Sequence, residues 1–430
     1  MNSPKSHFPR PAFAALAATG ALLAGCAGPA ANPSASPDAT DDAVPHGYVE
    51  GATEAAEPQL HLATVNPTGE VAVLDLQGGA TETIATVDGV SSVATDGRYL
   101  FASAADTGTV TIVDTGVWTV DHDDHQHYYR GTPGVAGTVT DAGPGAVSGG
   151  GSLTTVRFAD SGTGVILNHG ALGDGIVTEL GRVSGEPGAG LLVPFGDRVI
   201  TTSTGNGASA LQVLDATGDV VAGEAIECLD PAGTITTRVG VVFGCADGAV
   251  LATAAGLPAP DVQVEFERIP YPAGIATTDR AMSFDNRAGR PTVAAVAGDR
   301  GAWLLDTRER TWTLLSTDTA LAQVAAVDDP DQNVVALTRD GRVLVFDAES
   351  GATTAATEPL LAATLADGAP GGGSGSALPD GVTLTVDTNR AYLNAPAEGE
   401  VYEIDFADSA RLARTFPIDG RPRFLVETGR

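Results

Sequence analysis

Short runs of alternating apolar and polar residues, rather than a helical periodicity, fill the chain after Tyr48. They are rich in Val, Thr and Ala and are separated by Gly and Asp turns, which is typical of short β-strands. Six of the runs share one form, a five-residue strand that ends in Asp, and these are Val71–Asp75, Val110–Asp114, Leu211–Asp215, Ala302–Asp306, Val343–Asp347 and Val401–Asp405. A unit repeated this often indicates a repeat fold.

The spacing of the units predicts the kind of repeat fold. Where no insertion interrupts them, they recur about every 40 residues, which is the period of a four-stranded propeller blade. The predicted fold class is therefore all-β, a single β-propeller of four-stranded blades. Counting one inner strand for each blade gives eight blades, with seven as the alternative. These inner strands are expected near Ser92, Leu153, Leu191, Thr236, Ala281, Gln323, Val382 and Phe424.

The two ends of the repeat are each incomplete. The C-terminal segment Arg421–Thr428 has the pattern of an inner strand with no blade after it, and the N-terminal side offers three strands without a fourth, within Leu60–Val87. A closed ring leaves no open sheet edge, so we expect the N- and C-terminal strands to share one blade. The Asp at each strand end is predicted to be structural, because it can accept hydrogen bonds from the turn backbone two residues on.

The first 25 residues have the pattern of a signal peptide. Lys5 and Arg10 precede a short apolar run from Pro11 to Gly25, and Leu23–Cys26 resembles the lipobox of bacterial lipoproteins. Residues 1–25 are predicted to be removed and Cys26 to carry the lipid, with an ordinary secreted protein cut nearby as the alternative. Residues 26–58 contain few large apolar side chains and are predicted to be a disordered tether, which leaves residues 59–430 for the propeller.

The charge balance and the cysteines indicate the cellular compartment of the protein and the classes of partner that it can bind. The chain has 54 acidic and 23 basic residues and a formal net charge of -31, with Lys5 as its one lysine. This balance disfavours nucleic acid and anionic headgroups and attracts cations, so membrane contact is expected through the lipid alone. The predicted location is extracytoplasmic, on the cell membrane. In an oxidising compartment, Cys228 and Cys245 are expected to form a disulfide.

Three histidines lie within six residues in an insertion after Asp114. His122, His125 and His127 alternate there with acidic residues, namely Asp121, Asp123 and Asp124. Imidazoles and a carboxylate are suitable ligands for Zn²⁺, although copper or nickel could use them too. The pattern predicts a site that exchanges its ion, and the alternative is a solvated acidic loop.

Two other histidines stand alone among apolar and glycine neighbours. His61 lies in the first predicted strand and His169 follows a strand end. A lone histidine in such a setting is more often structural, so both are secondary candidates for metal binding.

The segment from His122 to His127 fits the pattern H-x-D-H-x-H. Together with the propeller repeat and the export signal, it resembles the AztD-type zinc metallochaperones. The resemblance implies an exported propeller that binds Zn²⁺ and hands it to the solute-binding protein of a zinc ABC importer. By motif position, it assigns metal capture to His122, Asp124, His125 and His127.

Two other functions compete with a metal carrier. A propeller could serve as a protein-binding scaffold at the cell surface, or it could be an enzyme of the lactonase or quinoprotein kind. The sequence shows no convergent set of strand-end His, Glu and Asn residues and no nucleophile motif with a neighbouring base. We therefore expect a non-enzymatic protein. We also expect it to be a monomer.

Overall fold

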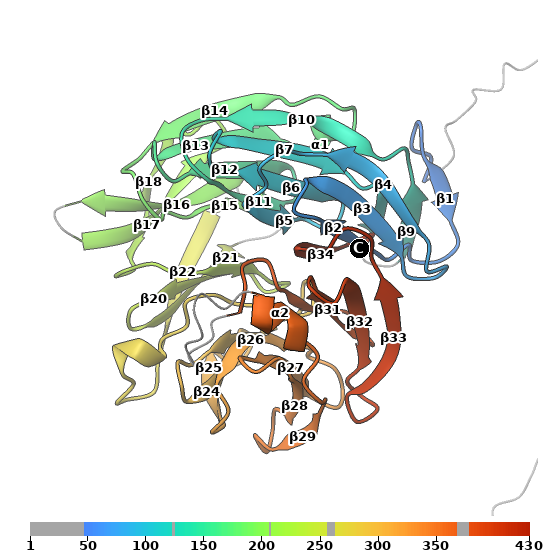
Figure 1. Ribbon diagram of the computed structural model, residues 1–430. Coiled ribbons are helices and arrows are strands. Elements are labelled where there is room, and N and C mark those ends of the chain that lie inside the picture. The colour runs from blue at the N-terminus through green and yellow to red at the C-terminus, as the bar shows by residue number, and fades with distance from the viewer. Residues whose placement is uncertain (1–46, 123–124, 206–207, 256–262, 368–377) are drawn as a thin grey trace, which may run out of the picture. The chain divides into compact units, whose positions relative to one another are not determined.

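The computed structural model describes residues 47–122, 125–205, 208–255, 263–367 and 378–430, which belong to one compact unit, Gly47–Arg430. Its strands form nine sheets, of which seven have four strands and two have three (Figure 1). The described helices are short: α1 (His169–Leu172), α2 (Ala362–Asp367) and a 3-10 turn at Thr277–Asp279. None of them is long or apolar enough to cross a membrane.

Eight of the nine sheets are the blades of a propeller, numbered here from the one that contains both ends of the repeat. Blade 1 is β34 (Phe424–Thr428), β2 (His61–Val65), β3 (Glu70–Asp75) and β4 (Thr81–Thr86). Blade 2 is β5 (Ser92–Thr95), β6 (Tyr99–Ala104), β7 (Thr109–Asp114) and β10 (Gly134–Thr140). Blade 3 is β11 (Gly145–Gly150), β12 (Leu153–Phe158), β13 (Thr163–Asn168) and β14 (Glu179–Ser184). Blade 4 is β15 (Leu192–Phe195), β16 (Arg198–Gly205), β17 (Ala208–Asp215) and β18 (Val220–Glu227).

The second half of the ring continues the series. Blade 5 is β19 (Thr234–Thr236), β20 (Val241–Cys245), β21 (Gly248–Ala255) and β22 (Gln263–Pro270). Blade 6 has three strands, β23 (Thr292–Val296), β24 (Gly301–Asp306) and β25 (Thr311–Ser316). Blade 7 is β26 (Leu321–Ala326), β27 (Asn333–Thr338), β28 (Val343–Asp347) and β29 (Thr353–Ala356). Blade 8 is β30 (Leu384–Val386), β31 (Ala391–Ala395), β32 (Glu400–Asp405) and β33 (Arg411–Pro417).

Packing between the blades closes the ring. The buried apolar residues form eight clusters, and each cluster joins two successive blades. The cluster that contains Leu62, Leu425 and Val401 joins blade 8 to blade 1. In blade 1 the C-terminal β34 pairs antiparallel with β2, with Phe424 opposite Val65 and Thr428 opposite His61. The predicted propeller, its eight blades and the shared terminal blade are therefore confirmed.

Two inner strands differ from the prediction. In blade 3 the inner strand is β11, whereas Leu153 begins the second strand, so the prediction near Leu153 was wrong. The sequence of β11, GAVSGG, carries little apolar alternation because the close approach of blade 2 selects glycine. A Cβ on Gly149 would lie 2.7 Å from Cβ of Asp96, in the turn after β5. In blade 6 the expected strand near Ala281 is reduced to a single bridge between Asp285 and Ala294.

The repeated aspartates hold the turns that follow their strands. In four of them, Oδ1 accepts from the backbone N–H two residues on: Asp75 from Gln77 (2.8 Å), Asp114 from Gly116 (2.9 Å), Asp215 from Thr217 (2.9 Å) and Asp306 from Arg308 (2.8 Å). For Asp347 and Asp405 the donor is three residues on, at Ser350 (2.6 Å) and Asp408 (3.1 Å). These carboxylates thus have the structural role that was predicted.

The boundary between tether and propeller lies earlier than predicted. Residues 47–58 were assigned to the tether, but they belong to the compact unit and contain strand β1 (Thr53–Ala55). This strand has no buried apolar face, and it is held by backbone pairing with β9 (Gln126–Arg130), which sequence periodicity does not reveal. The signal peptide, Cys26 and the rest of the tether lie outside the described residues.

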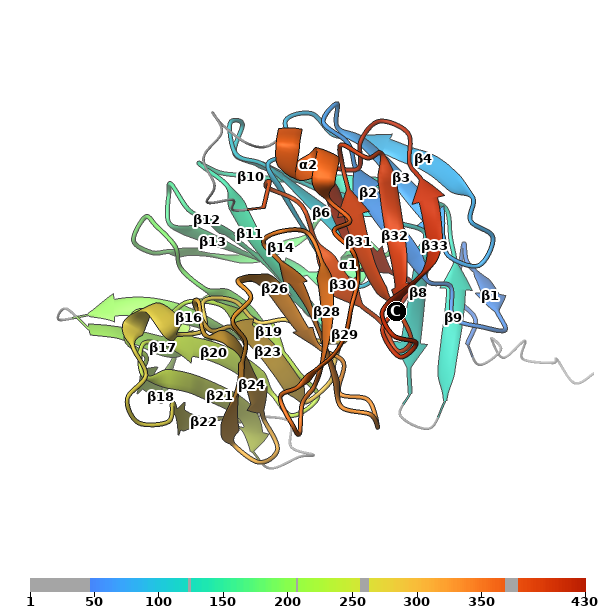
Figure 2. The same cartoon turned by 60° about the horizontal axis from the view of Figure 1, so that its bottom comes forward.

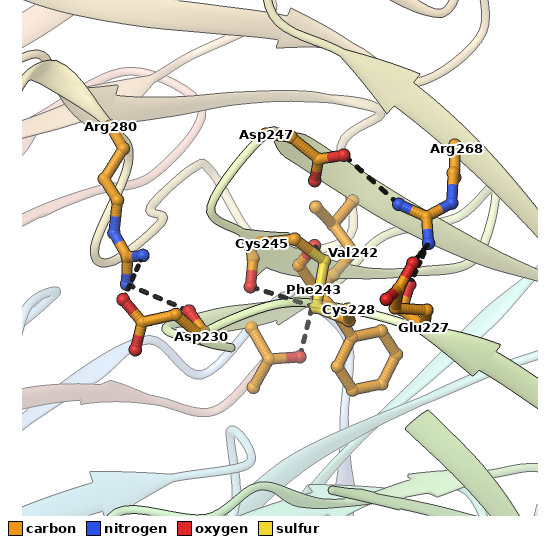
Figure 3. Close-up of a disulfide and its surroundings, with 11 residues drawn as sticks. Glu227, Cys228, Asp230, Val242, Phe243, Cys245, Asp247, Arg268 and Arg280 are labelled. Carbon is orange, nitrogen blue, oxygen red and sulfur yellow. Dashed lines mark hydrogen bonds and ion pairs between the residues drawn. A yellow bond between two sulfur atoms is a disulfide. The ribbon is translucent and has the colours of Figure 1, made fainter. Parts of the chain in front are cut away.

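The disulfide predicted from the two remaining cysteines is present between Cys228 and Cys245 (Figure 3). It joins the end of blade 4 to β20 of blade 5, and both cysteines are fully buried in the cluster between these blades. Ion pairs flank it on both sides: Arg280 contacts Asp230, and Arg268 contacts Glu227 and Asp247. The bond therefore fastens one junction of the ring.

Removal of this disulfide is expected to weaken the propeller without changing its fold. The bond closes a loop with a sequence separation of 17, for which loop-closure entropy gives about 3 kcal/mol of stabilisation. A Cys228→Ala, Cys245→Ala variant should lose about that much free energy of unfolding in urea titrations. A reducing agent should destabilise the parent and leave the variant unchanged; equal stability of the two proteins would contradict the expectation.

Candidate metal centre

The ninth sheet is built from the histidine insertion and carries the candidate site. Its strands are β8 (Val117–Asp121) and β9, which form an antiparallel hairpin between β7 and β10 of blade 2, and β1, which pairs with the other edge of β9. Figures 1 and 2 show this small sheet at the periphery of the ring. His122 follows β8 directly, and both His122 and His125 are exposed.

Aromatic stacking fixes the base of the hairpin on the propeller. Trp118 of β8 and Tyr129 of β9 are buried, with ring centroids 5.2 Å apart, and the guanidinium of Arg98 in blade 2 lies 3.7 Å from the Trp118 centroid. Arg98 is itself paired with Asp114 at 2.6 Å. At the C-terminus, the Thr119 hydroxyl donates to the Gly429 carbonyl at 2.8 Å. These contacts give the histidine turn a rigid support.

The three histidines of the insertion converge at the tip. The turn places the His122 N–H 2.9 Å from the His125 carbonyl oxygen, and His127 follows in β9. The His122 ring lies 5.2 Å, centroid to centroid, from both other rings, and those of His125 and His127 are 4.8 Å apart. Nε2 of His125 lies 3.0 Å from Nε2 of His127. The structure thus brings together three of the four predicted hairpin ligands.

The separation of these two nitrogens suits a shared metal ion. Two imidazole nitrogens bound at 2.0–2.1 Å to a tetrahedral zinc ion lie about 3.3 Å apart. The observed 3.0 Å requires only a small outward movement to admit the ion. A dication would also be favoured by the neighbouring carboxylates of Asp121 and Glu54, because opposite charges at short range attract.

On its Nδ1 side, His127 contacts a residue that the sequence analysis did not identify. Its Nδ1 lies 2.7 Å from Oε1 of Glu54 in β1, and the His127 side chain is buried. Glu54 is 73 residues away in the chain. No local motif links the two positions, so only the pairing of β1 with β9 reveals the contact.

The remaining predicted ligand, Asp124, lies outside the described residues, as does Asp123. In the ranges that the structure describes, no set of three His, Cys, Asp or Glu side chains is already arranged to hold a metal ion. The three rings therefore form a converging cluster, and their side chains would have to move before they could hold an ion together.

The two secondary candidates lie in other places with other partners. His61 begins β2 in blade 1, where Nε2 is 3.8 Å from Oδ1 of Asp75. His169 begins α1 after blade 3, with Nδ1 2.9 Å from the Thr154 hydroxyl and 3.6 Å from Oδ2 of Asp96. The structure brings neither one together with the hairpin histidines, so each remains a separate secondary candidate.

Burial of His61 leads to a prediction about pH. Its side chain is 9% exposed, neither ring nitrogen has a hydrogen-bond partner among the described residues, and burial lowers its pKa below 6.5 despite the attraction of Asp75. The unfolded chain therefore binds the proton more readily, so His61 contributes stability above about pH 6.5 that is lost as the pH falls toward the lowered pKa.

A His61→Phe variant tests this contribution. Between pH 7.5 and 5.5, the parent should lose up to about 1.4 kcal/mol more unfolding free energy per pH unit than the variant. Urea unfolding at the two pH values measures the difference. Parallel pH dependences would show that His61 is not the buried neutral group described here.

Fold and site together define an eight-bladed propeller that carries a three-histidine hairpin beside its ring. No family model matches the chain, and no curated protein matches it. The solved structures of AztD from Citrobacter koseri and of its apo form each have a TM-score of 0.70 at 18% identity, covering 86% of this chain and 98% of theirs. Dihydro-heme d1 dehydrogenase NirN has a TM-score of 0.51 at 15% identity, covering 87% of this chain and 76% of its own. The chain therefore has the AztD fold, as the sequence resemblance predicted.

Proposed function

We propose that this protein is a non-enzymatic zinc carrier that captures Zn²⁺ on the β8–β9 hairpin. The observation that carries the proposal is the convergence of His122, His125 and His127, two of which face each other through Nε2 at 3.0 Å. Neutral imidazole is a preferred ligand of zinc, and Glu54 behind His127 supplies the carboxylate partner that zinc-binding histidines commonly have. The AztD-like fold supports the same conclusion.

The position of the cluster favours transfer over permanent storage. Three imidazoles leave one position of a tetrahedral ion for a further ligand. In our proposal Asp124 takes this position in the carrier, and a donor from an acceptor protein replaces it during transfer. His122 and His125 are exposed on a sheet at the periphery of the ring, so an acceptor can reach them (Figure 2). We infer that the acceptor is the solute-binding protein of a zinc ABC importer.

The cellular setting completes the proposal. Export through residues 1–25 and lipidation of Cys26 would hold the propeller at the outer face of the cell membrane, where an importer collects its metal. The formal charge of -31 keeps the protein body away from anionic headgroups and nucleic acid and raises the local concentration of cations. A monomer suffices, because one hairpin contains all four proposed ligands.

A transfer assay tests this function. Residues 27–430, loaded with one equivalent of Zn²⁺, are mixed with a purified zinc-binding solute-binding protein, separated by size and assayed for metal. Zinc should reach the acceptor faster than it leaves the carrier for a small chelator of equal affinity. Equal rates would indicate release into solution, and a parent protein that binds no zinc would overturn the proposal itself.

A further inference from the structure

Glu54 and Gly47 cover the edge of His127 that faces away from the other histidines. Oε1 of Glu54 lies 2.7 Å from Nδ1, whereas Nε2 on the opposite side of the ring faces His125. A Cβ placed on Gly47 would lie 2.7 Å from Cε1 and 2.8 Å from Nδ1 of the same ring. Only glycine can bring the backbone this close, and Gly47 has a φ of +81°. The segment that leads from the tether into the propeller thus packs directly against His127.

The contact with Glu54 selects one form of the imidazole. An ionised carboxylate only accepts hydrogen bonds, so its partner Nδ1 must carry the proton of the neutral ring. The lone pair is then on Nε2, the atom that faces His125. Without Glu54, the ring loses the acceptor that favours the proton on Nδ1.

Among the described residues, the strand that carries Glu54 pairs with a neighbouring strand on one side. In the sheet order β1, β9, β8, strand β1 is an edge strand, and its register places Thr53 opposite Arg130, Glu54 opposite Tyr129 and Ala55 opposite Tyr128. Its approach is fixed by the Tyr129 hydroxyl, which donates to the Gly47 carbonyl at 2.8 Å. The position of Glu54 is therefore set by the three β1–β9 residue pairs and by the hydrogen bond from Tyr129 to Gly47, the first described residue.

We propose that Glu54 is a positioning residue that sets the zinc affinity of the hairpin by holding His127 in the Nδ1-protonated form with Nε2 aimed at the ion. This inference rests on the proposed function. Outer partners of metal-binding histidines commonly change metal affinity by 10- to 100-fold. The affinity of the site is thereby tied to the docking of β1, the first strand after the tether.

Three variants of residues 27–430, the mature chain without the lipidated Cys26, distinguish this positioning role from other roles of the segment. Glu54→Ala removes the acceptor, Glu54→Gln keeps an acceptor without the charge, and Glu57→Gln removes a carboxylate from the same exposed segment as a matched control. Zinc affinity is measured by competition with a chelator. We expect a loss of about 10- to 100-fold for Glu54→Ala, a smaller loss for Glu54→Gln and less than a twofold change for Glu57→Gln.

Two further measurements distinguish a change in the His127 ring from a general loss of structure in β1. Long-range ¹H–¹⁵N spectra of the metal-free protein should show His127 protonated on Nδ1 in the parent and mixed forms in Glu54→Ala, while hydrogen exchange of residues 53–55 reports whether β1 stays paired. An unchanged affinity in both Glu54 variants, or an equal loss in Glu57→Gln, overturns the inference while the parent still binds zinc. A parent that binds no zinc overturns the proposed function instead.

Discussion

Deletion of residues 421–430 is expected to unfold the propeller rather than to trim its end. The deletion removes β34, whose five residues pair with β2, and it removes the buried side chains of Phe424 and Leu425. Phe424 belongs to the cluster between blades 1 and 2, and Leu425 to the cluster between blades 8 and 1. One short strand therefore supports two junctions of the ring.

The expected loss of unfolding free energy is large enough to unfold the whole domain. Truncation of a buried Leu or Phe to Ala alone costs about 2–5 kcal/mol, and the deletion adds the loss of a sheet ladder and an exposed edge on β2. Domains are stable by only about 5–15 kcal/mol in total. Near-ultraviolet circular dichroism and urea titration should show no cooperative transition, whereas a chain that lacks residues 27–46 should unfold like the parent. A cooperative transition near the parent midpoint in the C-terminal deletion would show that the ring does not depend on β34.

Replacement of His122, His125 and His127 by alanine is expected to abolish zinc binding by the hairpin. The apparent free energy of zinc binding, roughly 10–16 kcal/mol in four-ligand sites, is shared among the ligands, so the loss of three should weaken binding at least about 1,000-fold. Competition with a chelator measures the change, and a thermal melt shows whether the propeller remains folded. Since Trp118 and Tyr129 support the base of the hairpin, the fold should persist.

A His169→Ala variant is the matched control, because it removes an imidazole whose partners are Thr154 and Asp96 rather than the hairpin. Its zinc affinity should remain within twofold of the parent. The reverse result, with zinc binding retained in the triple variant and lost in His169→Ala, would move the site away from the hairpin.

The fold was predictable from the sequence wherever the strands bury one face. The strand units that end at Asp75, Asp114 and Asp347 combine an apolar alternation with a turn aspartate, and the structure retains both. The inner strand β11 and the edge strand β1 were not predictable in this way. In β11 close approach of neighbouring strands selects glycine, and β1 is held by backbone pairing, so neither leaves an apolar pattern.

The candidate site was predictable as far as its residues are neighbours in the chain. His122, His125 and His127 lie within six residues of one hairpin, and a short hairpin brings neighbouring side chains together whatever the fold around it. Glu54 could not be predicted, because it is 73 residues from His127 in the chain and the contact depends on the pairing of β1 with β9.

Crystals of the mature protein soaked with one equivalent of Zn²⁺, with anomalous diffraction recorded on both sides of the zinc edge, test the central claim most directly. The account predicts a single strong peak at the tip of the hairpin, about 2.0–2.1 Å from Nε2 of His125 and of His127, with Glu54 still bound to Nδ1 of His127. A peak inside the ring or at another surface, with the three hairpin imidazoles unliganded, would contradict it.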